Sequence, residues 1–238
     1  MQLTVKVCGM RNPHNISEVA AAGADWIGLI FHPSSPRFVG RPDTATDAHP
    51  GAAVEIDVPP GIMKVGVFVD ADNDYISMQA ARHGLDLIQL HGNESPAAMQ
   101  SLRRSLRAGS LRGVRLIKAL HVASASDLQV WAAYAGCADF LLFDTKCPTA
   151  GGSGRQFDWT ALDSYDGSLP FLLSGGIGPY DADRIAGLCH PMMAGIDINS
   201  RFETAPAVKD AALIGRFIGR LRSAETTTQT QRLKQNKT

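Results

Sequence analysis

The stretch DFLLFD, residues 139–144, holds four large apolar side chains between two aspartates. A short run that is apolar at every position is typical of a parallel strand covered on both faces, because a half-exposed strand alternates apolar with polar residues. Seven further runs are similarly rich in Val, Ile, Leu and Phe: TVKVC from Thr4, DWIGLIF from Asp25, IMKVGVFV from Ile62, DLIQL from Asp86, VRLIKAL from Val114, PFLL from Pro170 and AGIDI from Ala194. Eight strands are therefore predicted.

The segments between these runs carry helix signals. The runs begin roughly 20 to 36 residues apart, which leaves room for the crossover helix that parallel strands require. In residues 95–109, Ser95 is a good N-cap, Pro96 suits the first helical position, and Gly109 suits the C-terminal end. In PAVKDAALIGRFIGRLRS, residues 206–223, helical spacing places four apolar residues near one face: Val208, Leu213, Phe217 and Leu221.

The repeat count decides the domain organisation. A length of 238 residues alone allows one large domain or two small ones. Eight strand–helix units that close on themselves predict a single-domain (β/α)₈ TIM barrel over residues 1–222. Residues 40–61 carry four prolines and predict an irregular connection. Residues 223–238 hold one large apolar side chain, Leu233, so a disordered polar tail is expected there.

Composition excludes several classes of protein. The 23 basic and 23 acidic side chains balance, whereas nucleic-acid binding needs a basic excess. The sequence shows neither an apolar run long enough for a membrane helix nor a signal-peptide pattern, so we expect a cytoplasmic protein with no membrane partner. Its four cysteines lack CxxC spacing, and its histidines lack HxxxH spacing. Reduced thiols and a site without metal are expected.

The loops that follow the predicted strands collect the polar chemistry. In a barrel of this type, the active site lies at the carboxyl ends of the strands, and phosphate often binds the loops after strands seven and eight. Those loops are SGGIGPYD, residues 174–181, and INSRFET, residues 198–204. Glycines and a following helix N-terminus favour an anion, although Gly175 and Gly176 are also what a tight turn alone requires. A phosphorylated small molecule is the expected partner.

The chain resembles the phosphoribosylanthranilate isomerase family in eight motifs. They are KVCGM (6–10), HPSSPRFV (32–39), VGVFVD (65–70), IQLHGNE (88–94), LLFDTK (141–146), GGSGRQFDW (151–159), LSGGI (173–177) and GIDINSRFET with VKD (195–210). The resemblance covers nearly the whole chain apart from residues 40–61 and the tail. It implies a (β/α)₈ fold, which agrees with the repeat count.

The resemblance also implies a reaction. Members of the family carry out the Amadori rearrangement of N-(5-phosphoribosyl)anthranilate to 1-(2-carboxyphenylamino)-1-deoxyribulose 5-phosphate, in tryptophan biosynthesis, without a cofactor. By resemblance, Asp144 is the general acid that opens the ribose ring, and Cys8 is the general base that takes a proton from the adjacent carbon. A thiol base needs nearby positive charge, and an acid that holds its proton near neutral pH needs a desolvated site.

The same resemblance implies further site residues. Arg37 matches the residue that meets the anthranilate carboxylate, and His91 and Asp197 match positions that line the site. The phosphate positions are implied to be Gly175, Gly176, Asn199, Ser200 and Arg201. Arg201 stands where many members have glycine, so the expected turn would lack glycine's freedom at positive φ, while a charge contact with phosphate becomes available.

Other interpretations stay open at this stage. Cys8 is also compatible with a buried core thiol, and Asp144 with a cap on the following turn. The alternatives for function are another phosphosugar barrel, such as a histidine-pathway aminoaldose isomerase, and a non-catalytic phosphate-binding barrel. The histidine-pathway family uses two aspartates, whereas the first strand here ends in Cys8. Monomer and homodimer are both compatible with the sequence.

Overall fold

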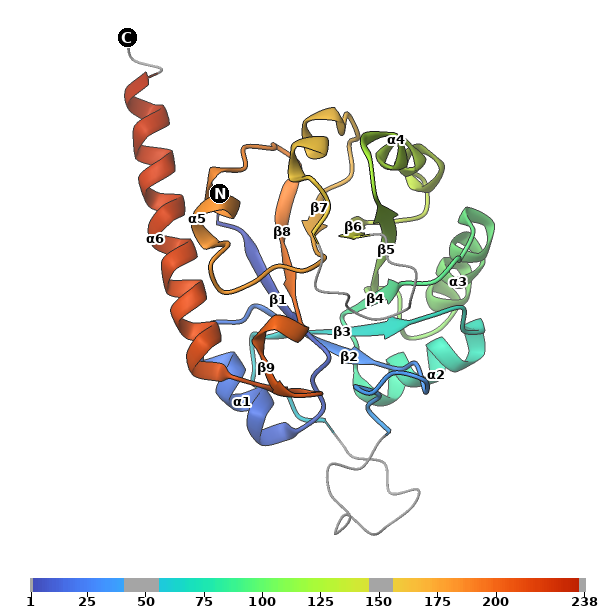
Figure 1. The fold of residues 1–238 in the computed structure, drawn as a ribbon. Coiled ribbons are helices and arrows are strands. Elements are labelled where there is room, and N and C mark those ends of the chain that lie inside the picture. The colour runs from blue at the N-terminus through green and yellow to red at the C-terminus, as the bar shows by residue number, and fades with distance from the viewer. Residues whose placement is uncertain (1, 41–55, 146–155, 236–238) are drawn as a thin grey trace.

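A computed structural model describes residues 2–40, 56–145 and 156–235, and its centre is a closed barrel of eight parallel strands (Figure 1). The strands are β1 (Thr4–Cys8), β2 (Trp26–Ile30), β3 (Met63–Phe68), β4 (Leu87–Leu90), β5 (Arg115–Val122), β6 (Phe140–Thr145), β7 (Phe171–Leu173) and β8 (Met193–Ile198). They pair in chain order, and β8 closes the barrel on β1 with Val5 opposite Ile196. All eight predicted strands and the (β/α)₈ fold are confirmed.

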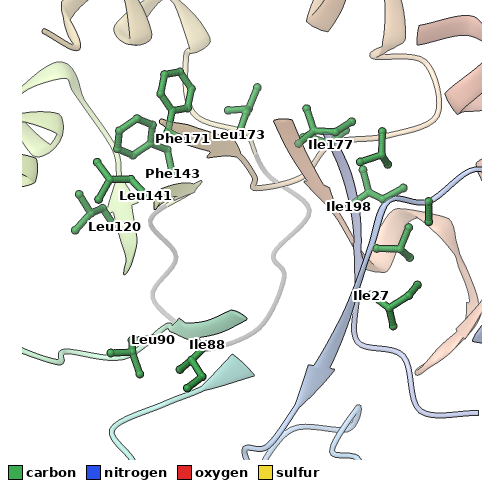
Figure 2. Packing of buried hydrophobic residues seen from close by; sticks show 14 of the residues in the cluster. Ile27, Ile88, Leu90, Leu120, Leu141, Phe143, Phe171, Leu173, Ile177 and Ile198 are labelled. Carbon is green, nitrogen blue, oxygen red and sulfur yellow. The ribbon is translucent and has the colours of Figure 1, made fainter. Parts of the chain in front are cut away.

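Side chains of the strands alternate between two apolar layers, because successive residues of a strand point to opposite faces. One buried cluster draws on β2 through β7, whose side chains meet across the barrel interior: Trp26, Val65, Leu87, Ile117, Ala119, Leu142 and Leu172. A larger cluster lies between the strands and the surrounding helices. Figure 2 shows members of this outer layer, among them Ile27, Leu141 and Phe171, on the outside of the barrel wall. Both strand faces are therefore covered, as the continuous apolar runs indicated.

The outer layer is less regular than eight full helices. It contains α1 (Pro13–Ala21), α2 (Asn73–His83), α3 (Pro96–Ala108), α4 (Ala125–Leu128), α5 (Ala182–Gly187) and α6 (Ala211–Gln235), with 3₁₀ helices η1 (Gln129–Tyr134), η2 (Trp159–Ser164) and η3 (Ser200–Phe202). The described part of the second connection, residues 31–40 and 56–62, has no helix. Residues 41–55 of the predicted irregular segment lie outside the described residues. α3 begins and ends as predicted, with the Ser95 side chain accepting a hydrogen bond from the Ala98 N–H.

The last helix begins later in the chain than the sequence predicted. Val208 lies in a small strand, β10 (Val208–Lys209), which pairs with β9 (Glu203–Ala205), and it is 39% exposed. Helix α6 begins only at Ala211, where the preceding Asp210 caps it by accepting the Leu213 N–H. Val208 is thus not on the apolar helix face, because the loop after β8 forms a short hairpin before the helix starts.

The expected disordered tail is wrong for residues 223–235, which continue α6 along the side of the barrel (Figure 1). Glu225 is buried and accepts the Leu3 N–H at 2.8 Å, and Arg222 contacts both Glu225 and Asp25. Once a helix has nucleated, each added residue costs little, so a polar sequence can extend a docked helix. Residues 236–238 lie outside the described residues.

Candidate active site

The carboxyl end of the barrel gathers polar side chains that point inward. Lys6 and Cys8 share one face of β1, Asp144 shares a face of β6 with interior Leu142, and Asp197 projects from β8 toward Lys6. Polar groups therefore replace the apolar interior at this end, where a barrel of this type places its chemistry.

The Cys8 thiol occupies space that a glycine leaves open. A Cβ on Gly28 of β2 would lie 2.9 Å from the Cys8 sulfur, closer than real side chains allow. Cys8 itself is only 4% exposed. Gly28 therefore lets the thiol sit inside the barrel wall, with its sulfur turned toward the interior.

A buried ion pair lies two residues before the thiol. Lys6 Nζ donates to Asp197 Oδ1 at 2.8 Å, and Ser174 Oγ lies 3.4 Å from the other carboxylate oxygen. Both charged residues are buried. Asp197, one of the predicted site residues, has Lys6 as its direct partner. Sequence reasoning did not single out Lys6, although a lysine inside an apolar strand, at i−2 from Cys8 and so on the same face, was a usable signal.

The charges around Cys8 have opposing effects on its acidity. Burial raises the pKa of the Cys8 thiol; the positive charge of Lys6 opposes this rise, Asp197 adds to it, and Lys209 opposes it again. The expected positive neighbours are therefore present, but the effect of burial on the Cys8 pKa outweighs theirs. For Lys6, burial alone would lower the pKa, yet Asp197 and Cys8 hold it above the ordinary lysine value.

Arg37 belongs to a second charged network beside the thiol. Its Nε and Nη2 donate to the two Glu203 oxygens at 2.8 and 2.6 Å, and Lys209 Nζ donates to Glu203 Oε1 and to Asn199 Oδ1, each at 2.6 Å. These bonds occupy one edge of the Arg37 guanidinium, and among the described residues no bond is made by Nη1. Glu203 and Lys209 were not predicted, since their role depends on the hairpin after β8.

Asp144 sits in a cluster of imidazole rings. Its Oδ2 lies 3.2 Å from His91 Nε2, and its Oδ1 accepts the backbone N–H of Thr145. On its other side, His91 Nδ1 lies 2.8 Å from the Gln89 carboxamide, and the ring makes an edge contact with His121. Partial desolvation of the ring and the neighbouring His91 lower the pKa of His121, although its side chain reaches solvent. The structure thus brings together Asp144 and His91, which the sequence predicted as separate site residues, while Gln89 and His121 were not predicted.

The two predicted phosphate loops lie next to each other. Gly175 and Gly176 have φ of 86° and 68°, and a Cβ on Gly175 would overlap the Thr145 backbone and hydroxyl. The Arg201 side chain passes over Gly178, whose added Cβ would lie 3.2 Å from Arg201 Cδ. Among the described residues, Arg201 is not at positive φ, because residues 200–202 form the 3₁₀ turn η3. The chain therefore makes this turn without glycine.

A family model described as N-(5'phosphoribosyl)anthranilate (PRA) isomerase matches residues 5–220. The chain belongs to this family. Every predicted site residue falls inside the matched range, and the resemblance seen in the sequence is confirmed.

Relatives of known sequence or structure match this chain over more than nine tenths of its length. N-(5'-phosphoribosyl)anthranilate isomerase of Parabacteroides distasonis is 44% identical over 91% of this chain and 92% of its own length. Monomers made from the dimeric phosphoribosylanthranilate isomerase of Thermotoga maritima are 26% identical, with a TM-score of 0.73 over 93% of this chain and all of theirs. A family structure in complex with reduced 1-(o-carboxyphenylamino)-1-deoxyribulose 5-phosphate, also 26% identical, matches with a TM-score of 0.72 over 93% and 100% of the two chains.

Two further observations bear on the expectations for this phosphoribosylanthranilate isomerase family member. No helix in the described residues is long and apolar enough to cross a membrane. Residues 146–155, which include Cys147 and the first five residues of the GGSGRQFDW motif, lie outside the described residues.

Proposed function

We propose that this protein catalyses the Amadori rearrangement of N-(5'-phosphoribosyl)anthranilate, in tryptophan biosynthesis. One observation carries the proposal: the Cys8 thiol and the Asp144 carboxyl project into the same end of the barrel from β1 and β6, in a chain of this family. A base and an acid are thereby available in separate environments, one among ammonium groups and one beside an imidazole.

Substrate binding uses the two anionic ends of the substrate. The phosphate binds at the loops after β7 and β8, where Gly175, Gly176, Asn199, Ser200 and Arg201 are gathered. The close approach of the Arg201 side chain to Gly178 supports this shared site. Arg37 binds the anthranilate carboxylate through the guanidinium edge that Glu203 leaves open, since Glu203 holds the other edge in a fixed orientation.

Ring opening is the task of Asp144. Its carboxyl donates a proton to the ribose ring oxygen, the bond from C1 to that oxygen breaks, and the nitrogen lone pair forms an iminium. His91 lies 3.2 Å from Asp144 and positions the carboxyl for this transfer. After the transfer, the Thr145 N–H stabilises the carboxylate.

Proton removal from C2 is the task of Cys8. The thiol needs to become a thiolate, and burial opposes this by raising its pKa. The iminium cation formed in the first step adds positive charge to that of Lys6 and Lys209, and so favours the thiolate. Cys8 then takes the C2 proton, the C–H electrons form the C1–C2 double bond of the enolamine, and protonation at C1 with loss of the enol proton gives the ketone.

The proposal includes a cytoplasmic location and a homodimeric or monomeric assembly. Free thiols at Cys8 and Cys137 suit a reducing cytoplasm. The dimeric relative from Thermotoga maritima supports a homodimer as one of the two assemblies, with the monomer as the other. The reaction needs no cofactor, because the substrate nitrogen accepts the electrons.

The test is steady-state turnover, followed by the decay of anthranilate fluorescence. Cys8→Ser and Asp144→Asn are each expected to lose at least about a thousandfold in kcat, because each removes a proton-transfer group. Both variants should keep the circular dichroism spectrum and the affinity for a phosphorylated product analogue. Full activity in either variant would refute that residue's role, and inactive wild-type protein would refute the proposed reaction.

A further inference from the structure

Three metal-ligating side chains meet at the mouth of the barrel. Ligand atoms of His91, His121 and Asp144 all lie within 4.8 Å of one another. The residues come from the ends of three neighbouring strands, β4, β5 and β6. A spacing motif along one helix could not reveal this set, which explains why the sequence predicted no metal site.

The distances between these ligand atoms are close to those around a bound zinc ion. Zinc binds imidazole nitrogen and carboxylate oxygen at about 2.0–2.2 Å, so tetrahedral ligand atoms stand about 3.3 Å apart. His91 Nε2 and Asp144 Oδ2 are already 3.2 Å apart. His121 needs to close by at most about 1.5 Å to complete the triad. It lies exposed at the mouth, so its side chain can make this adjustment.

Gln89 supplies the outer hydrogen bond that metal-binding histidines require. As placed, its Nε2 faces His91 Nδ1, and its Oε1 is buried with no hydrogen-bond partner in the described part of the chain. A half-turn of the carboxamide exchanges these two atoms. Oε1 then accepts a hydrogen bond from the Nδ1–H group, and the His91 Nε2 lone pair faces Asp144 and His121.

We propose that His91, His121 and Asp144 bind one divalent ion of the zinc class, which blocks the general acid. The ion takes the place of the proton that Asp144 carries as the proposed general acid, and that proton passes to solvent. No electron transfer is involved. Two imidazoles and one carboxylate suit zinc and leave a fourth position for water. Binding stands independently of the proposed reaction, whereas inhibition rests on it.

Calorimetric titration with Zn²⁺ alone tests binding. The informative variant is His121→Phe, which removes the ligand nitrogen and keeps an aromatic ring against His91. The matched control is Cys189→Ser, which removes the exposed cysteine. We expect one ion per chain in the wild type and in the Cys189→Ser variant, and binding at least about tenfold weaker in the His121→Phe variant. Equal affinity in the wild type and the His121→Phe variant, or weakened binding in the Cys189→Ser variant, would overturn the proposal.

Turnover gives the second measurement. Zn²⁺ should inhibit the wild type in competition with substrate, while the turnover that the His121→Phe variant shows without metal should resist inhibition by the same Zn²⁺ concentrations. Zinc that binds at the triad without lowering turnover would overturn the inhibitory part. Protein that binds zinc as expected but shows no isomerase activity would refute the proposed function and leave the metal site standing.

Discussion

Replacing Lys6 with methionine tests the charged interior of the barrel. Methionine keeps most of the lysine volume and removes the ammonium group, so Asp197 Oδ1 loses its partner at 2.8 Å. Both residues are buried, and the weaker contact from Ser174, at 3.4 Å, does not replace an ion pair. The variant therefore leaves an uncompensated carboxylate beside the thiol.

The cost follows from the burial of the pair. Breaking a buried ion pair on one side costs about 3–5 kcal/mol, whereas replacing both partners with apolar residues is close to neutral. A domain of this size shifts its melting temperature by about 2–4 °C per kcal/mol, so the Lys6→Met variant should melt roughly 6–20 °C lower. The double variant Lys6→Met with Asp197→Leu should recover most of this loss.

Urea unfolding followed by circular dichroism measures these free energies. Asp197 and Cys8 hold the pKa of Lys6 above the ordinary value of about 10.4, against the effect of burial. A raised pKa means that the stabilisation is present below the unfolded-state pKa and is lost only as pH rises through the folded-state pKa. The difference between wild type and the Lys6→Met variant should thus stay constant around neutral pH. A loss under about 1 kcal/mol, or a double variant as unstable as the sum of its single changes, would refute this reasoning.

The same variant has a chemical signature at Cys8. Lys6 opposes the raised pKa of the thiol, so its loss should raise that pKa further and move alkylation of Cys8 to higher pH. Mass spectrometry can follow the labelling, with exposed Cys189 as the reference in the same molecule. An unchanged pH profile for Cys8 would mean that Lys6 does not tune the thiol.

Three further predictions concern the substrate loops and the response to pH. Arg37→Ala should raise KM for the anthranilate substrate about 10- to 100-fold, because a charged hydrogen bond contributes about 1.5–3 kcal/mol. The KM of Arg37→Lys should lie between those of the wild type and Arg37→Ala. An unchanged KM in Arg37→Ala would exclude the carboxylate contact. Gly175→Ala should weaken the binding of inorganic phosphate, measured by calorimetry, and destabilise the fold by at least about 1–3 kcal/mol. The reason is that φ at Gly175 is +86° and the added methyl group would overlap Thr145. Wild-type phosphate affinity together with wild-type stability would contradict the assigned turn. Although burial opposes it, Arg37 and Lys209 lower the pKa of Glu203, so its stabilisation should be present above the unfolded-state value of about 4.3 and be lost as pH falls below it. Urea midpoints measured against pH should therefore fall less steeply in Glu203→Gln, and parallel curves would count against the network.

Local patterns were enough to predict the barrel and part of the site. The apolar runs identified all eight strands, since burial on both faces leaves a continuous signature that does not depend on distant residues. The strand-end positions of Cys8 and Asp144 follow directly from that order. The disordered tail was wrongly predicted because the Glu225 contact with Leu3 joins opposite ends of the chain.

The sequence by itself determined the fold, the family and the residues that carry the proposed chemistry, because these depend on local periodicity and on short motifs in order. Only the tertiary structure decided the partners of those residues. Asp197 meets Lys6 across 191 positions, Arg37 meets Glu203 across 166, and the His91, His121 and Asp144 triad joins three strands. The physical reason is barrel closure, which brings the ends of all strands to one mouth, so that burial and charge act between residues with no sequence proximity.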